Sequence, residues 1–223
     1  MRICVVIPVH NENRSIAELV KALLEKGLDV LVVDDGSTDG SGEIAIQEGA
    51  YVIHHPVRKG KGASLKEGFN YIQESGYEGI IVMDGDGQHD PKDLPYFMQA
   101  ATDESVDLVI GNRMDNTKNM PPLRLITNKF MSALISYACG KKIPDTQCGF
   151  RFIRVAVLKA LDLQCNDFEI ETEMLMKAAR QNLTIISIPI TTIYRNEESK
   201  IHPVRDSVRF FKYFLKEAWT KKR

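Results

Sequence analysis

The chain has 223 residues, of which 43% are apolar and 26% are charged, and its formal net charge is -1. This is an ordinary globular composition, long enough for one sizeable core, so we expect a single domain over residues 1–223. The near-zero charge argues against a nucleic-acid-binding protein held by bulk electrostatics. No apolar run approaches the roughly 18 residues that span a bilayer.

Strands and helices are expected to alternate along the first half of the chain. A strand over residues 2–9 precedes a helix over residues 15–26, which ends at Gly27. The next expected elements are a strand at 30–33, a helix ending near 49, a strand at 51–54, a helix at 63–75, a strand at 80–83, a helix at 92–102 and a strand at 106–111. This alternation with short loops is typical of an α/β fold, in which helices cover both faces of a mostly parallel sheet.

The second half is less regular. A helix over residues 123–139 is unusually rich in apolar side chains, and residues 145–151 form a compact polar cluster. A helix over 168–181 and a strand over 184–188 follow, and from residue 202 the chain becomes basic and aromatic. The four cysteines (Cys4, Cys139, Cys148 and Cys165) show no close-spaced pair, so we expect them to be small buried side chains in a reducing cytoplasm.

Each of the first four predicted strands is followed by a polar, charged or Gly-rich cluster. In an open α/β sheet the carboxyl ends of the strands border the ligand crevice, so these four clusters should converge on one site. The residues concerned are His10, Glu12, Asp34, Asp35, Arg58, Lys59, Asp84 and Asp86.

The fourth cluster has the most specific chemistry. Asp84 and Asp86 are two residues apart after a buried strand, so on extended backbone both carboxylates point to the same side. Two hard oxygen ligands, with room for water and phosphate oxygens, suit Mg²⁺ or Mn²⁺ shared with a nucleoside diphosphate. The structural alternative is a polar turn in which Asp and Gly serve only the backbone.

With these residues in view, the sequence resembles a family 2 glycosyltransferase of the GT-A fold, and most of all the dolichyl-phosphate or polyprenyl-phosphate mannose synthase group. The resemblance rests on motifs that occur in order over nearly the whole chain: residues 7–12 (IPVHNE), 34–39 (DDGSTD), 84–91 (DGDGQHDP), 145–151 (DTQCGFR), Tyr194-Arg195 and Ser199-Lys200. It implies a nucleotide-sugar-binding half over 1–112, an acceptor-binding half over 113–200 and a basic amphipathic helix over 201–223.

The resemblance also implies roles for individual residues. The donor would be bound by Pro8, His10, Glu12, Asp35, Lys59, Asp84, Arg195 and Lys200. The metal ligands would be Asp84, Asp86 and Gln88, of which Asp86 and Gln88 count as catalytic. Arg113 and Arg124 would bind the acceptor phosphate. His10 stands where a tyrosine is common in the family, so the base of the donor stays open between GDP-mannose, which the resemblance favours, and UDP-glucose.

The acceptor decides whether a base is needed. A lipid phosphate is already an anion, so positioning and charge stabilisation could suffice. An alcohol acceptor would need a base, for which Asp145 is the first candidate and Glu169 or Glu171 the next. The structural alternative makes Asp145 a turn or cap residue and the glutamates a solvated helix face.

The C-terminal segment favours a lipid acceptor. Residues 200–223 hold eight Lys or Arg against one Asp and one Glu, with aromatic side chains at helical spacing. Such a helix suits a membrane interface or, equally, the protein's own core.

The sequence therefore predicts an inverting, metal-dependent hexosyltransferase that acts on a polyprenyl phosphate, peripheral to the cytoplasmic face of the membrane. A saccharide or small-alcohol acceptor is the first alternative. A sugar-1-phosphate nucleotidylyltransferase is disfavoured because Val9-His10-Asn11-Glu12 replaces the expected Gly-rich basic loop. A non-catalytic nucleotide-binding protein is disfavoured by the intact Asp84, Asp86 and Gln88.

Overall fold

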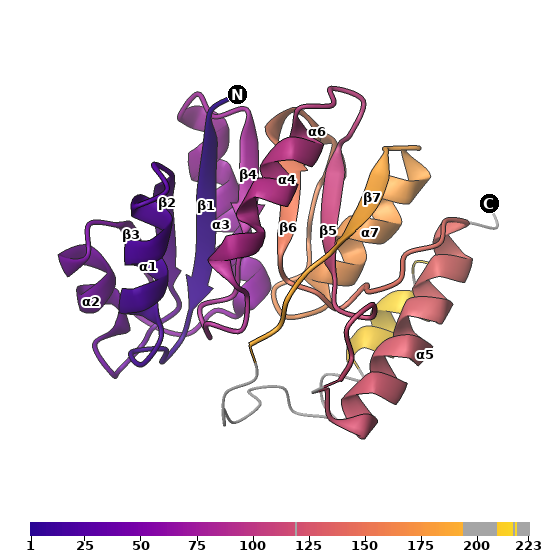
Figure 1. Cartoon of the computed structure of the whole chain (residues 1–223), viewed down its shortest axis with the longest axis horizontal. Helices are drawn as coiled ribbons and strands as arrows, with labels where there is room; N and C mark the ends of the chain where they lie inside the picture. Colours follow the sequence, from indigo (N-terminus) through magenta and orange to yellow (C-terminus); the bar gives the residue numbers. More distant parts are fainter. Residues whose placement is uncertain (119, 194–208, 216, 218–223) are drawn as a thin grey trace.

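The computed structural model describes residues 1–118, 120–193, 209–215 and 217, which build a seven-stranded sheet between two layers of helices (Figure 1). The strands are β1 (Ile3–Val9), β2 (Asp29–Asp34), β3 (Tyr51–His54), β4 (Gly79–Val82), β5 (Leu108–Asn112), β6 (Arg151–Arg154) and β7 (Ile185–Pro189). The helices are α1 (Ile16–Leu24), α2 (Ser41–Gln47), α3 (Lys61–Glu74), α4 (Leu94–Ala101), α5 (Pro122–Cys139), α6 (Val155–Leu161) and α7 (Ile170–Arg180), with a short 3-10 helix η1 (Pro91–Asp93) before α4.

The sheet has the strand order β3-β2-β1-β4-β6-β5-β7. β1 pairs in parallel with β2 and β4, β2 with β3, and β5 with β7, whereas β6 is antiparallel to both of its neighbours. The predicted mostly parallel α/β sheet is confirmed. Strand β6 and helix α6 are not predicted by the sequence pattern, because a four-residue strand with an arginine at each end lacks the usual apolar run.

The core forms where the strands carry β-branched side chains. β1, β2 and β4 are almost entirely buried, as expected for strands covered on both faces. Helices α1, α2 and α4 contribute to one layer and α3, α6 and α7 to the other, while α5 lies against α7 at the β7 end of the sheet. Gly68 allows α3 to approach β1 closely, since a Cβ there would lie 2.7 Å from Val6 Cγ1.

The antiparallel strand β6 explains why distant sequence clusters meet. Val82 at the end of β4 and Ile110 near the end of β5 both pair with Arg151, the first residue of β6. The polar cluster before β6 therefore lies at the same edge of the sheet as the loops that follow β4 and β5. We call this the carboxyl edge of the sheet.

The described part of the C-terminal segment packs on the protein. Phe210 and Phe214 are 5% and 8% exposed and belong to the core, whereas Phe211 and Leu215 are exposed. Arg209 forms an ion pair with Asp167 at 2.6 Å. Of the two alternatives left open for this helix, docking on the core is thus observed for one of its faces.

The four cysteines are free thiols, and burial raises the pKa of Cys4 and Cys148 to about 12, which suits unreactive side chains. In the part of the chain that the structure describes, no helix combines the length and apolarity needed to cross a membrane.

Candidate active site at the carboxyl edge of the sheet

The turn after β4 presents the predicted metal-binding residues. Asp84, Asp86 and Gln88 are partly exposed, and the residues between and before them are more buried or are glycines. The backbone amide of Gln88 donates a hydrogen bond to Asp86 Oδ1 at 2.9 Å, and the backbone amide of Asp84 donates to His89 Nδ1 at 3.2 Å. His89 is buried and burial lowers its pKa despite the nearby carboxylates, which agrees with a neutral ring whose Nδ1 accepts.

The nearest cation to Asp84 is one that sequence reasoning missed. Lys61, the first residue of α3, places its Nζ 2.5 Å from Asp84 Oδ1 and 2.6 Å from Glu171 Oε1. Burial would raise the pKa of Asp84, but the charge and hydrogen bond of Lys61, together with His89 and Arg113, hold that pKa well below its usual range. The sequence feature that could have identified this residue is the position of Lys61 between two glycines, directly after the loop that follows β3.

Asp35 organises the loop after β3 rather than standing open to a ligand. Its Oδ1 accepts from the Lys59 amide at 2.7 Å and contacts His55 Nδ1 at 2.9 Å, and its Oδ2 accepts from the Gly60 amide at 2.8 Å. Burial would raise the pKa of Asp35, but these hydrogen bonds lower it. His55 also contacts Glu67 at 2.7 Å, and the Lys59 side chain points to the same glutamate at 3.5 Å.

The loop after β1 joins the same edge. Pro8, His10 and Glu12 alternate along the chain and are each partly exposed. His10 Nδ1 lies 2.9 Å from the Asp35 carbonyl oxygen, and the Glu12 amide donates to Ser41 Oγ at 2.8 Å. The first and fourth clusters meet directly, because Ser15 Oγ donates to the Gly85 carbonyl at 2.6 Å.

Arg113 and Asp145 are predicted to have separate roles, but they form a buried pair. Arg113 Nε donates to Asp145 Oδ2 at 2.6 Å, and its Nη2 donates to Oδ1 at 2.9 Å. Asp145 is fully buried and also accepts from the Gln147 amide, while Arg113 is 4% exposed. This geometry opposes Asp145 as a general base and favours the structural alternative, since both of its oxygens are engaged by cationic or amide donors.

Arg124 connects helix α5 to the turn after β4. It lies in the first turn of α5, and its Nη1 donates to Gln88 Oε1 at 3.3 Å. The same helix exposes large apolar side chains: Leu123 (78%), Ile126 (66%), Phe130 (58%) and Tyr137 (87%). We call these four side chains the apolar row of α5.

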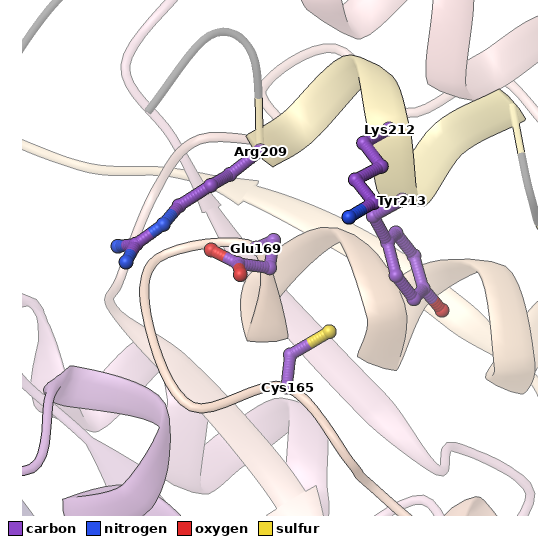
Figure 2. A pocket seen from close by; sticks show the side chains of 5 residues that line it. All are labelled: Cys165, Glu169, Arg209, Lys212 and Tyr213. Atoms are coloured by element: carbon purple, nitrogen blue, oxygen red, sulfur yellow. The ribbon is translucent and has the colours of Figure 1, made fainter. Parts of the chain in front are cut away.

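The other candidate bases lie in different surroundings. Glu171 is paired with Lys61, as described above. Glu169 lines a pocket between the loop before α7 and the C-terminal helix, together with Cys165, Arg209, Lys212 and Tyr213 (Figure 2). The predicted donor-binding residues Arg195 and Lys200 lie outside the described residues.

The donor set at the β4 turn fits a hard divalent cation. Two carboxylates and one amide oxygen are the ligands that Mg²⁺ and Mn²⁺ accept, with water and phosphate completing the shell. Within residues 1–118, 120–193, 209–215 and 217, no three His, Cys, Asp or Glu side chains could hold a metal by themselves. A metal here would therefore take further oxygen ligands from Gln88, from water or from a bound phosphate.

Comparison with known proteins identifies the family to which this chain belongs. The family model described as glycosyl transferase family 2 matches residues 4–162. An undecaprenyl-phosphate mannosyltransferase from Micrococcus luteus is 33% identical over 217 residues, which cover 90% of this chain and 88% of that protein. A polyprenol monophosphomannose synthase from Mycolicibacterium smegmatis is 30% identical, covering 85% of this chain and 77% of that protein.

Solved structures share the architecture. Glucosyl-3-phosphoglycerate synthase from Mycobacterium tuberculosis, in complex with phosphoglyceric acid, superposes with a TM-score of 0.76 at 20% identity, covering 97% of this chain and 80% of that one. The same enzyme with Mn²⁺, uridine diphosphate and phosphoglyceric acid gives a TM-score of 0.74. The expected GT-A fold and the resemblance to polyprenyl-phosphate mannose synthases are confirmed.

Proposed function

Because this chain belongs to glycosyl transferase family 2, we propose that it moves a hexose from a nucleoside-diphosphate donor to a polyprenyl phosphate, with inversion at the anomeric carbon. Its relatives make it a hexosyltransferase. GDP-mannose is the donor we favour, since two relatives are named as mannose-transferring enzymes, and UDP-glucose is the second. In this proposal residues 1–112 hold the donor and residues 113–200 the acceptor.

The observation that carries the proposal is the position of α5. Arg124 at its start contacts Gln88 in the β4 turn, while the apolar row of the same helix is exposed. A polyprenyl phosphate has an anionic head and a long apolar tail. One helix thus offers a cation beside the donor site and an apolar surface for the lipid or for the membrane that contains it.

The charges of the site fit the departure of a nucleoside diphosphate. A divalent metal, Mg²⁺ or Mn²⁺, held by Asp84, Asp86 and Gln88 would offset the charge on the leaving diphosphate. The loop after β3, held by Asp35, and the loop after β1, with Pro8, His10 and Glu12, would border the nucleoside. Arg195 and Lys200 are proposed to close over the diphosphate on resemblance alone.

The acceptor phosphate needs orientation rather than deprotonation. Asp145 and Glu171, two of the three candidate bases, are held in ion pairs with Arg113 and Lys61. An acceptor that is already ionised requires neither of them as a base. We assign Arg124 to the acceptor phosphate. Arg113 is assigned there in a lesser role, because two of its guanidinium nitrogens bind Asp145.

We further propose that the protein works at the cytoplasmic face of the membrane as a peripheral protein. The relatives' names refer to lipid-linked acceptors. The exposed apolar row of α5, with Phe211 and Leu215 of the C-terminal helix, supplies apolar side chains for such contact.

The acceptor assignment can be tested by offering three matched acceptors with the same labelled donor: a polyprenyl phosphate, the corresponding polyprenol and phosphoglyceric acid. We expect label only on the polyprenyl phosphate. Transfer to the polyprenol would require a general base, for which Glu169 is the remaining candidate. Transfer to phosphoglyceric acid would contradict the lipid acceptor and keep the reaction class.

A further inference from the structure

Lys61 is a largely buried cation beside the proposed metal site. Its side chain is 13% exposed, and its ammonium lies 2.5 Å from Asp84 Oδ1 and 2.6 Å from Glu171 Oε1. The ring of Phe168 faces the same ammonium, with its centroid at 5.8 Å. Asp84 is therefore already paired with a positive charge that the chain itself supplies.

The backbone around Lys61 fixes this charge in place. Gly60 has a φ of 104°, and a Cβ there would lie 2.5 Å from the Asn166 carbonyl oxygen. A Cβ on Gly62 would lie 2.6 Å from the Cys165 carbonyl oxygen. Both glycines let the start of α3 lie directly on the loop before α7, and the Ala63 amide donates to the Asn166 carbonyl at 3.0 Å. Lys61 is thus held between β4 and α7 by close backbone packing.

A divalent cation at Asp84 would lie close to this ammonium. Like charges repel, and the repulsion is stronger in a partly buried site than in water. The second oxygen, Asp84 Oδ2, lies against Gly149, where an added Cβ would come within 2.4 Å of it, and 4.0 Å from His89 Nε2. A ligand that brings several negative charges, such as a nucleoside diphosphate, would offset the repulsion.

We propose that Lys61 is an internal counter-ion that keeps metal affinity weak until the donor binds, so that the metal enters together with the diphosphate. Lys61 acts here as a positioning residue for Asp84, and its partner Glu171 holds the ammonium in place. The inference rests on the proposed function, which supplies the metal and the diphosphate.

The test measures Mn²⁺ binding to the purified protein by calorimetry, with and without GDP or UDP. The decisive variant is the double substitution Lys61→Met with Glu171→Gln, which removes one positive and one negative charge and so preserves the local balance. We expect nucleotide-free Mn²⁺ affinity to rise on the order of tenfold or more relative to the wild type, because the competing ammonium is gone. Glu171→Gln alone, which leaves Lys61 with Asp84 only, should not raise it.

Lys66→Met is the matched control. Lys66 lies on the same helix, but its ammonium binds the Gln164 carbonyl and Asn166 Oδ1. This variant should bind Mn²⁺ as the wild type does. A structural role for Lys61 would weaken metal binding or leave it unchanged, so an unchanged or weaker nucleotide-free affinity in the folded double variant would overturn the inference.

Mn²⁺ binding by the wild type distinguishes failure of this inference from failure of the proposed function. Mn²⁺ binding that is weak alone and strong with GDP or UDP supports both. Strong Mn²⁺ binding by the wild type alone overturns the counter-ion role and leaves the transferase intact. Failure to bind Mn²⁺ even with either nucleotide contradicts the metal-dependent function itself.

Discussion

Single side chains at the carboxyl edge divide into those that hold the loops together and those that we propose to face a ligand. Asp35, Asp145 and Glu171 belong to the first group, because amides or cations of the chain engage their carboxylates. Asp84, Asp86 and Gln88 stay partly exposed at the β4 turn and are the residues proposed to face a ligand, although Lys61 pairs with one oxygen of Asp84. The two groups should respond differently to substitution.

Asp86→Ala should reduce transfer by roughly a hundredfold or more while leaving the fold intact, because it removes a proposed metal ligand at a partly exposed turn. Turnover and thermal unfolding measured together would show this. Asp103→Asn, in an exposed turn after α4, is the control and should change neither quantity. Near-wild-type turnover in Asp86→Ala would exclude a metal at this position.

Asp145→Ala should lower the free energy of unfolding by about 3–5 kcal/mol, since it leaves Arg113 buried without its carboxylate. Denaturant unfolding measures this directly. The double variant Arg113→Met with Asp145→Leu should recover much of the loss, because no charge is then left buried alone. An Asp145→Ala protein with unchanged stability and abolished transfer would instead support Asp145 as a catalytic base.

Two elements do most to shape the site, and they act in different ways. The loop after β3 is fixed by Asp35, which accepts from two of its backbone amides, and it borders the proposed donor side. Helix α5 connects Arg124 beside the β4 turn with an exposed apolar row. Each arrangement predicts a measurable property.

The loop after β3 should make stability sensitive to acid. The pKa of Asp35 is lower in the folded protein than its ordinary value, which is about 3.9 in an unfolded chain. Its contribution to stability is therefore complete above that value and is lost as the pH falls toward the folded pKa. We expect the wild type to lose more unfolding free energy than Asp35→Asn between pH 5 and pH 3, and equal losses would contradict this.

The apolar row of α5 should matter for membranes and not for folding. Ile126→Ser and Phe130→Ser should each change stability by no more than about 0.5 kcal/mol, because both side chains are exposed in the folded chain. Each should weaken partitioning into anionic vesicles about tenfold, as expected when one large apolar contact is lost. Ile46→Ser is the matched control: Ile46 is 60% exposed on α2, at the opposite end of the sheet from α5 (Figure 1). Equal losses in all three variants would exclude α5 as the docking surface.

For the whole molecule, the sequence was most informative where patterns repeat. Apolar strands followed by polar clusters predicted the parallel part of the sheet and its carboxyl edge, because alternation of strand and helix leaves few alternative arrangements. The sequence pattern does not predict the short strand β6. It therefore also does not predict that residues 145–151 lie at the carboxyl edge. The pairing of β6 with β4 and β5 depends on residues about 70 and 40 positions away, which local patterns do not reveal.

The role of individual charges was harder to predict than their location. The sequence assigns Arg113 to the acceptor phosphate and Asp145 to base chemistry, but their pairing is a long-range contact between the residue after β5 and the loop before β6. The sequence does not single out Lys61, because only the fold brings it to Asp84 and Glu171. Motifs thus predict a candidate site, whereas the partners of each side chain require the structure.

The central claim is that this edge of the sheet transfers a hexose from a nucleotide sugar to a lipid phosphate. The most direct measurement supplies radiolabelled GDP-mannose or UDP-glucose, with Mg²⁺ or Mn²⁺, to the protein and a polyprenyl phosphate, and then extracts the products into organic solvent. We predict label in the lipid phase from one donor, lost on adding EDTA. Label confined to water-soluble products, or lipid label that persists in EDTA, would contradict the account.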